Sequence, residues 1–141
     1  MNFETAVAII FEHEGGYVND PKDLGGETRY GISKRAYPTL NIKDLTKAEA
    51  RTIYKRDYWD RIKADQLPDW LRLMAFDCAV NQGVGACQTI LKSIVMDHPK
   101  NLVLGSFTDA RLVRYARNPA FNHFGLGWTR RLIDILLRSI G

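Results

Sequence analysis

Glu14 is the acidic residue whose neighbours best suit it to proton transfer. Apolar side chains precede it at helical spacing, at Phe3, Val7, Ile10 and Phe11, which predicts an amphipathic helix with one buried face. Glu14 continues that face, so we expect its carboxyl at the core edge and at the helix C-terminus. Burial and the negative end of the helix dipole both favour a protonated carboxyl. Such a group is a general acid, although a glutamate at a helix end is more often a solvated surface residue.

The glycine-rich segment after Glu14 contains candidate partners for that acid. We expect left-handed turns at its glycines, namely Gly15, Gly25-Gly26 and Gly31. Residues 17–18 and 28–30 favour short strands, so we predict a small, irregular β-hairpin. Such a hairpin folds Asp20, Asp23 and Thr28 back towards Glu14. Two carboxyl groups across a cleft, with a hydroxyl between them, suit glycoside hydrolysis.

Several sequence blocks carry a family resemblance. They are EGGYVNDP at residues 14–21, DLGGETRYGIS at 23–33, LTKAEA at 45–50, YW at 58–59 and FDCAVNQG at 76–83, with a weaker echo at 124–131. Together they closely resemble glycoside hydrolase family 108. Leu24 stands where the family usually has proline. The Asp-Gly turn of the family's C-terminal wall-binding module is reduced here to Gly105 and Thr108.

The resemblance implies a phage or prophage endolysin, an N-acetylmuramidase of the lysozyme type. Its substrate is then the β-1,4 bond between N-acetylmuramic acid and N-acetylglucosamine in bacterial peptidoglycan, and its effect is lysis of the host cell. Glu14 donates the proton in this interpretation, while Asp23 and Thr28 orient the attacking water. Asp20 competes with Asp23 as the second carboxylate, but Asn19-Asp20-Pro21 is also typical of a plain turn.

Further side chains are candidates for binding the glycan. Tyr30 packs either against a sugar ring or into the hairpin core. Asn81 and Gln82 end an apolar helix and either bind the N-acetyl group and hydroxyls of the substrate or cap the helix. Asp77 within that helix needs an arginine or backbone partner, because an unpaired buried charge is costly. We expect core or cleft-wall positions for Trp59 and Trp128, and a solvated basic face at Arg130 and Arg131.

Composition and charge narrow the class of partner. The chain has 141 residues, 45% hydrophobic and 26% charged, which is typical of one globular domain. Residues 71–141 hold 9 Lys/Arg against 4 Asp/Glu, whereas residues 1–70 hold 11 against 12. A basic half favours an anionic polymer. Because no nucleic-acid-binding motif is present, we expect peptidoglycan glycan strands as the partner and no nucleic acid.

The sequence also suggests where the protein acts. No apolar run approaches the roughly 20 residues that span a bilayer, and no signal peptide is evident. We expect a monomer in the host cytoplasm, without stable membrane insertion, released to the wall by a separate membrane-permeabilising protein. Cys78 and Cys87 fall on apolar helical stretches, which favours buried free thiols. The histidines show no ligand spacing, so we expect no metal and no cofactor.

Helical patterns dominate the rest of the chain. A capping box at residues 46–49 predicts a helix to about residue 59, and Pro68-Asp69 begins a helix that Gly83 and Gly85 end. Further helices are expected around residues 87–95, at about 108–117 and after Pro119. We predict a mainly α, lysozyme-like α+β fold: a single globular domain of about six helices with a small β-hairpin near the active site. Residues 1–86 are then the catalytic region, and residues 87–141 resemble a shortened peptidoglycan-binding module packed into the same domain.

Two alternative functions remain open from the sequence. A lytic transglycosylase needs only the glutamate and forms a 1,6-anhydro product, but gives Asp23 and Thr28 no role. A catalytically inactive wall-binding module has no need for an acid at a helix end. For the hydrolase, an inverting or a retaining outcome depends on whether the carboxyls are about 6.5–9.5 Å or about 5 Å apart.

Overall fold

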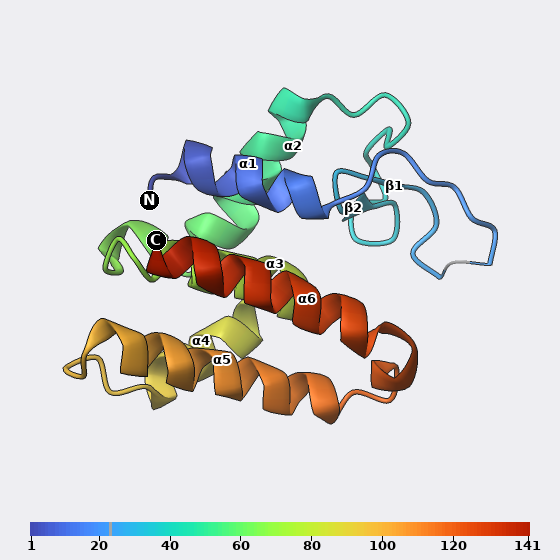
Figure 1. Ribbon diagram of the computed structural model, residues 1–141. Helices are drawn as coiled ribbons and strands as arrows, with labels where there is room; N and C mark the ends of the chain where they lie inside the picture. The colour runs from blue at the N-terminus through green and yellow to red at the C-terminus, as the bar shows by residue number, and fades with distance from the viewer. Residues whose placement is uncertain (23) are drawn as a thin grey trace. The chain divides into compact units, whose positions relative to one another are not determined.

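A computed structural model describes residues 1–22 and 24–141 of the chain (Figure 1). The chain divides into two compact units. We call Phe3–Asp57 the hairpin unit, and Met1–Asn2 together with Tyr58–Gly141 the helical unit. In the part of the chain that the structure describes, no helix combines the length and the apolar composition needed to cross a membrane.

The hairpin unit contains two helices and one small sheet. Helix α1 spans Phe3–His13 and buries Ala6, Val7, Ile9 and Ile10. Of the predicted apolar face, Val7 and Ile10 are buried, whereas Phe3 and Phe11 are half-buried. Strands β1 (Thr28–Arg29) and β2 (Ile32–Ser33) pair antiparallel, with Thr28 opposite Ser33. Helix α2, Lys47–Tyr54, begins at the predicted capping box, in which Thr46 and Glu49 each bond the other's backbone N–H. A π-helical turn, η1 (Lys55–Trp59), continues α2, and its last two residues belong to the helical unit.

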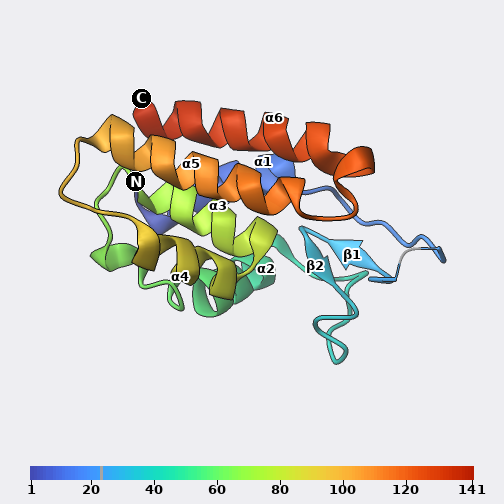
Figure 2. The ribbon, with the colours of Figure 1, turned by 90° about the horizontal axis from the view of Figure 1, so that it is seen from below.

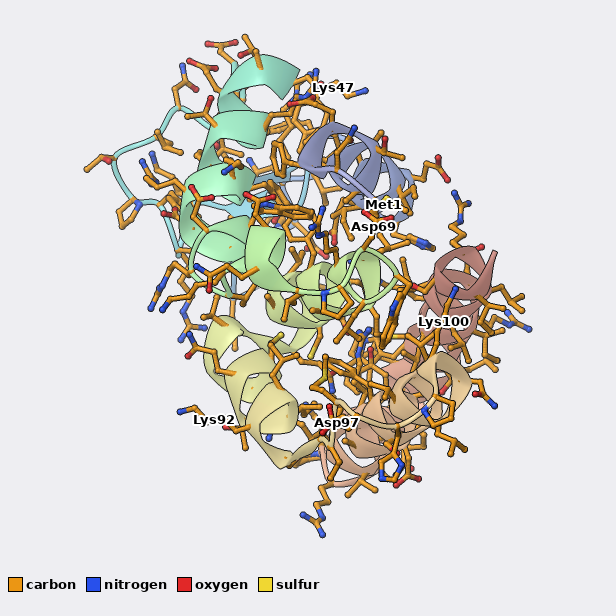
Figure 3. All side chains as sticks on the ribbon, turned by 90° about the vertical axis from the view of Figure 1, so that its left-hand side faces the viewer. Met1, Lys47, Asp69, Lys92, Asp97 and Lys100 are labelled. Carbon is orange, nitrogen blue, oxygen red and sulfur yellow. The ribbon has the colours of Figure 1, made fainter. Side chains whose placement is uncertain are left out.

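The helical unit is built around one apolar helix. After a short 3-10 turn, η2 (Ala64–Gln66), helix α3 spans Arg72–Gln82 and is buried from Leu73 to Ala79. Helices α4 (Val84–Ser93) and α6 (Phe121–Ile140) pack against α3, and α5 (Lys100–Ala116) packs against α4 and α6. Figures 1 and 2 show α5 and α6 running side by side in opposite directions. Met1 joins this unit beside Asp69, whose carboxylate pairs with its amino group (Figure 3).

Over residues 1–22 and 24–141, the structure confirms the predicted fold of about six helices with a small hairpin, but several boundaries differ. Strand β1 pairs with residues 32–33 across a tight turn, whereas residues 17–18 supply only a bridge between Val18 and Thr28. Of the three predicted left-handed turns, those at Gly26 and Gly31 are present, with φ of 69° and 74°, and that at Gly15 is absent.

The helix starts also differ from the predictions. Helix α3 begins at Arg72 rather than at residue 68, and Gly85 lies inside α4 rather than in a break. Helix α5 begins at Lys100, eight residues earlier than expected, and includes Gly105. Its buried residues at 103, 104 and 107 keep the helical spacing, and Gly105 lies on the exposed side. Packing of that face outweighs the cost of about 1 kcal/mol for a glycine in a helix.

Candidate active site

Glu14 lies directly after α1, where the chain leaves the helix. Its backbone N–H still donates to Ile10 O at 3.2 Å, so the residue completes the last helical turn. The side chain is half-buried, whereas the next two residues, Gly15 and Gly16, are exposed. The position at the edge of the apolar face is therefore the one that the helical spacing predicts.

A tight turn at Tyr30-Gly31 joins the two strands of the hairpin. Both residues have positive φ, 50° and 74°, as two-residue turns of type I′ require. A tyrosine in this conformation costs about 1–2 kcal/mol. Two contacts offset that cost: Tyr54 OH donates to Tyr30 O at 2.7 Å, and the Tyr30 ring packs against Phe11 with centroids 5.4 Å apart. The strained turn is thus fixed by α1 and α2 of the same unit.

Gly31 brings this turn into close contact with Glu14. A Cβ atom on Gly31 would stand 2.8 Å from Glu14 Oε2 and 2.5 Å from Tyr54 OH. Real Cβ atoms do not approach other atoms so closely, so only glycine fits both the conformation and the space. We call Glu14, Tyr30, Gly31 and Tyr54 the acid turn. The sequence indicated Gly31 for its turn but not for this contact.

The other predicted catalytic residues lie on or near the same hairpin. Thr28 in β1 is half-buried, exchanges two backbone hydrogen bonds of 2.8 Å with Val18, and directs its hydroxyl to Gly26 O at 3.4 Å. Asp20 is exposed and accepts from Lys22 N at 2.9 Å, which is the turn role weighed against catalysis. Asp23 lies outside the described residues.

The helical unit holds a buried ion network beneath Asn81 and Gln82. Asp77 and Arg111 are both fully buried, and Asp77 Oδ2 accepts from Arg111 Nη2 at 2.8 Å. Asp77 Oδ1 accepts from Arg131 Nε at 2.8 Å. Burial lowers the pKa of Arg111, but the charge of Asp77 opposes this and the net shift is upward, so the guanidinium stays ionised. The predicted arginine partner of Asp77 is confirmed, whereas the predicted solvated position of Arg131 is wrong, because Asp77 draws it inward.

This network fixes both amides of the predicted binding pair. Gln82 Oε1 accepts from Arg111 Nε at 2.7 Å, and Gln82 Nε2 donates to Arg111 O at 3.2 Å. Asn81 Oδ1 accepts from Tyr115 OH and, at 3.5 Å, from Arg111 Nη2. Tyr115 is buried, which raises the pKa of its hydroxyl above the ordinary value and keeps it a hydrogen-bond donor. The side-chain orientation of Asn81 is therefore set by two donors on its oxygen.

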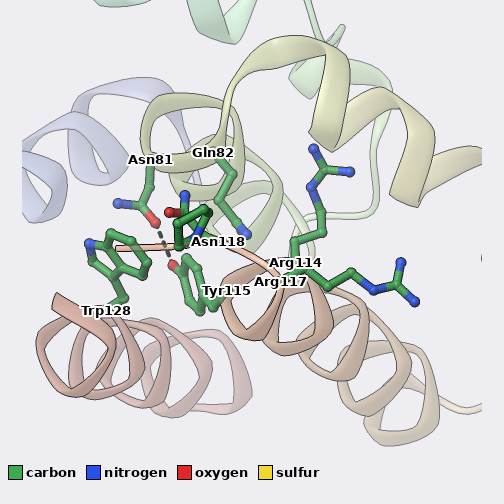
Figure 4. A pocket seen from close by; sticks show the side chains of 8 residues that line it. Asn81, Gln82, Arg114, Tyr115, Arg117, Asn118 and Trp128 are labelled. Atoms are coloured by element: carbon green, nitrogen blue, oxygen red, sulfur yellow. Dashed lines mark hydrogen bonds between the residues drawn. The ribbon is translucent and has the colours of Figure 1, made fainter. Parts of the chain in front are cut away.

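Asn81 and Gln82 open onto a pocket of about 450 Å³. Its wall includes Tyr115 and Trp128, whose rings lie 5.3 Å apart, and the guanidinium groups of Arg114 and Arg117. Figure 4 shows Trp128 at one end and the two arginines at the other, with the amides between them. We call these six residues the amide pocket. Core or cleft-wall positions were expected for both Trp59 and Trp128. Trp128 lies in the wall of this pocket, and Trp59 is fully buried in the core.

Sequence reasoning missed the residues that hold Asn81 and Gln82. Arg111 occupies a position on the buried face of α5, one turn after Phe107. An arginine in an apolar stripe signals a buried acidic partner, and Asp77 was already known to need one. Tyr115 follows at the next turn of the same face. The two signals together could have identified the network.

Comparisons with known proteins agree with this structure. Residues 7–83 match the family described as Glycosyl hydrolase 108. The solved structure of SagA from Brucella abortus is similar over 98% of this chain and 93% of that chain, with a TM-score of 0.87 and 28% sequence identity. No curated protein sequence matches the chain. The predicted lysozyme-like α+β fold is confirmed, and the chain belongs to the glycosyl hydrolase 108 family, as a glycoside hydrolase that degrades peptidoglycan.

Proposed function

We propose that this chain is an N-acetylmuramidase that hydrolyses the β-1,4 bond between N-acetylmuramic acid and N-acetylglucosamine. Glu14 gives its proton to the glycosidic oxygen as the bond from that oxygen to the sugar C1 breaks. A water molecule attacks C1 and loses its proton to Asp23, with the Thr28 hydroxyl orienting it. The N-acetylglucosamine fragment leaves with a new hydroxyl, and the muramic acid fragment gains a reducing end.

One observation carries this proposal: the Glu14 carboxyl is seated against a turn in which only glycine leaves room for it. General acids need a fixed position relative to the scissile bond, because small displacements slow the reaction severely. A surface glutamate without function does not require a left-handed glycine and a strained tyrosine beside it. The acid turn thus supports Glu14 as the proton donor.

The test is the activity of Glu14→Gln on purified peptidoglycan, with released fragments identified by mass spectrometry. The amide keeps the size of the side chain but cannot donate the proton, so we expect a loss of about 10²–10⁴ in rate. Glu12→Gln, an exposed position on α1 with the same change in charge, is the matched control and should retain its rate. More than a tenth of wild-type activity in Glu14→Gln would remove Glu14 from the mechanism.

The same fragments separate the rival reactions. Hydrolysis gives reducing muramic acid ends that carry oxygen from labelled water, whereas a lytic transglycosylase gives 1,6-anhydro ends without it. If neither kind of fragment is released, the chain would instead be a catalytically inactive wall-binding module. Asp23→Asn should slow hydrolysis more than Asp20→Asn, and the reverse order would assign the second carboxylate to Asp20. The anomer formed first distinguishes inversion from retention.

We also propose that the enzyme acts as a phage endolysin, monomeric, released from the host cytoplasm by a separate membrane-permeabilising protein. The sequence blocks that resemble phage and prophage endolysins support this role. Expressed inside a bacterium, the chain should lyse the culture rapidly only after the inner membrane is permeabilised. Lysis at the same rate without permeabilisation would contradict the need for a release protein.

A further inference from the structure

The amide pocket offers a ligand mostly hydrogen-bond donors and positive charge. Asn81 Oδ1 is already occupied by Tyr115 and Arg111, and within the described residues its nitrogen has no acceptor. Figure 4 shows that nitrogen on the side of Asn81 away from Tyr115. An amide fixed in this orientation presents N–H groups to the pocket. A ligand that meets it must bring an acceptor oxygen.

Two cationic side chains extend this donor surface. Arg114 and Arg117 are exposed, and no ion pair is formed by either one among the described residues. Among the described residues, those that line the pocket include no carboxylate. Unpaired guanidinium groups at the edge of a concave site attract carboxylates and bind them with two parallel hydrogen bonds.

The opposite end of the pocket is aromatic. Trp128 is half-buried, and its ring is tilted by 31° relative to that of Tyr115. Aromatic faces of this kind take aliphatic groups or the C–H face of a sugar. A ligand that fills the whole pocket therefore has an apolar part at one end and a carboxylate at the other, with amide groups between them.

We propose that the amide pocket binds the acidic peptide stem of peptidoglycan, with a stem carboxylate on Arg114 and Arg117. The stem has aliphatic side chains, amide bonds and free carboxylates, which match the three parts of the pocket in kind. A phosphate of a wall polymer meets the guanidinium groups equally well but leaves the aromatic end unfilled. This inference rests on the proposed function for its substrate, and it assigns the peptide to a pocket in the helical unit.

Binding can be measured without catalysis, by nuclear magnetic resonance on the full chain with a free acidic stem tetrapeptide. We expect the peptide to shift the Trp128 indole and Asn81 side-chain amide signals. Amidation of the peptide carboxylates should weaken binding about tenfold or more, because the charge-assisted bonds are lost. Equal binding of both forms would overturn the proposal, as would shifts by inorganic phosphate that match those of the peptide.

Cleavage rates test the same site in the working enzyme. Wild type should cleave peptide-bearing glycan faster than glycan stripped of its peptides, by about tenfold. The double variant Arg114→Gln/Arg117→Gln should lose this preference while its rate on stripped glycan stays within about twofold. The double variant Lys92→Gln/Arg130→Gln removes the same charge from exposed positions outside the pocket and should keep the preference.

The outcomes separate the two proposals. If both double variants lose the preference for peptide-bearing glycan equally, the preference comes from general charge attraction, and the pocket assignment is overturned. Peptide binding without cleavage of either glycan would overturn the muramidase proposal and leave the pocket standing. Cleavage of both glycans at equal rates, with no peptide binding, would overturn the pocket assignment and leave the muramidase proposal standing.

Discussion

The acid turn and the amide pocket hold their polar side chains by different means. In the acid turn, a left-handed backbone and a missing Cβ make room for Glu14, and one hydroxyl fixes the strained residue. In the amide pocket, a fully buried ion pair between Asp77 and Arg111 anchors the amides. A site built from backbone geometry is sensitive to one added atom, whereas a site built on buried charge is sensitive to one lost charge.

The largest effect should follow from removing the acid of the network. Asp77→Asn keeps the size of the side chain but leaves Arg111 buried without its carboxylate, along with Arg131. Breaking a buried ion pair costs about 3–5 kcal/mol in free energy of unfolding, which chemical denaturation would measure. Asp97→Asn, an exposed position in the same unit, should change it by less than about 0.5 kcal/mol. If both variants lose a similar amount of free energy of unfolding, the ion network does not stabilise the fold.

The next effect concerns the acid turn and should appear chiefly in activity. In Gly31→Ala, the new Cβ overlaps the positions of Glu14 Oε2 and Tyr54 OH, so the carboxyl must move. A displacement of about 1 Å can cost about 10²-fold in rate. Gly16→Ala is the control, since a Cβ there meets nothing within 4 Å. Unchanged cleavage by folded Gly31→Ala would show that the turn does not position the acid.

A smaller effect isolates the support of the turn. Tyr54→Phe removes the hydroxyl that donates to Tyr30 O at 2.7 Å but keeps the ring that packs on Phe11. We expect a loss of about 1 kcal/mol in free energy of unfolding. We also expect a loss of catalytic rate that is smaller than that of Gly31→Ala. Adding Tyr54→Phe to Gly31→Ala should cost less than the sum of the single changes, because both act on one turn. Strict additivity of the two losses would argue against a shared role.

The smallest effect depends on pH and concerns the start of α2. The backbone N–H of Thr46 and then its hydroxyl bond to Glu49 and lower the pKa of that carboxyl. Because the folded pKa lies below the unfolded one, this stabilisation is present at neutral pH and is lost as the pH falls through the folded pKa. Glu49→Gln should therefore melt slightly below wild type at about pH 7, and the difference should shrink as the pH falls through the folded pKa. A difference that grows on acidification would reverse the assigned sign.

The two regions also differ in how far the sequence predicted them. Apolar spacing in α1 placed Glu14 at a helix end and core edge, because a helix repeats its faces locally. The need of Asp77 for a partner was likewise local, since charge inside an apolar helix is visible in the sequence. Its partner Arg111 lies 34 residues away, and no local pattern connects the two. The contact between Gly31 and Glu14 depends on how the hairpin folds back, so turn chemistry alone predicted only the left-handed glycine.

The predicted helix boundaries were wrong where a glycine was interpreted as a break in the helix. Gly105 suggested a break, but the buried face of α5 runs through it from Val103 to Arg111. The roles of Glu14, Asp23 and Thr28 in catalysis, and of Tyr30, Asn81 and Gln82 in binding, stay predictions that the experiments above address. The division of the chain into a catalytic region at 1–86 and a wall-binding region at 87–141 also stays a prediction.

The buried pair of Asp77 and Arg111 restricts how this sequence can change over time. Replacing either residue alone leaves a charge inside the helical unit, so each single step passes through a poorly stable protein. Replacing both by apolar residues of similar volume can restore or raise stability, but it releases the amides of Asn81 and Gln82. Lineages that retain peptide binding at the pocket should therefore keep both residues, and lineages that abandon it should lose both together. The two positions, although distant in the sequence, should therefore change together.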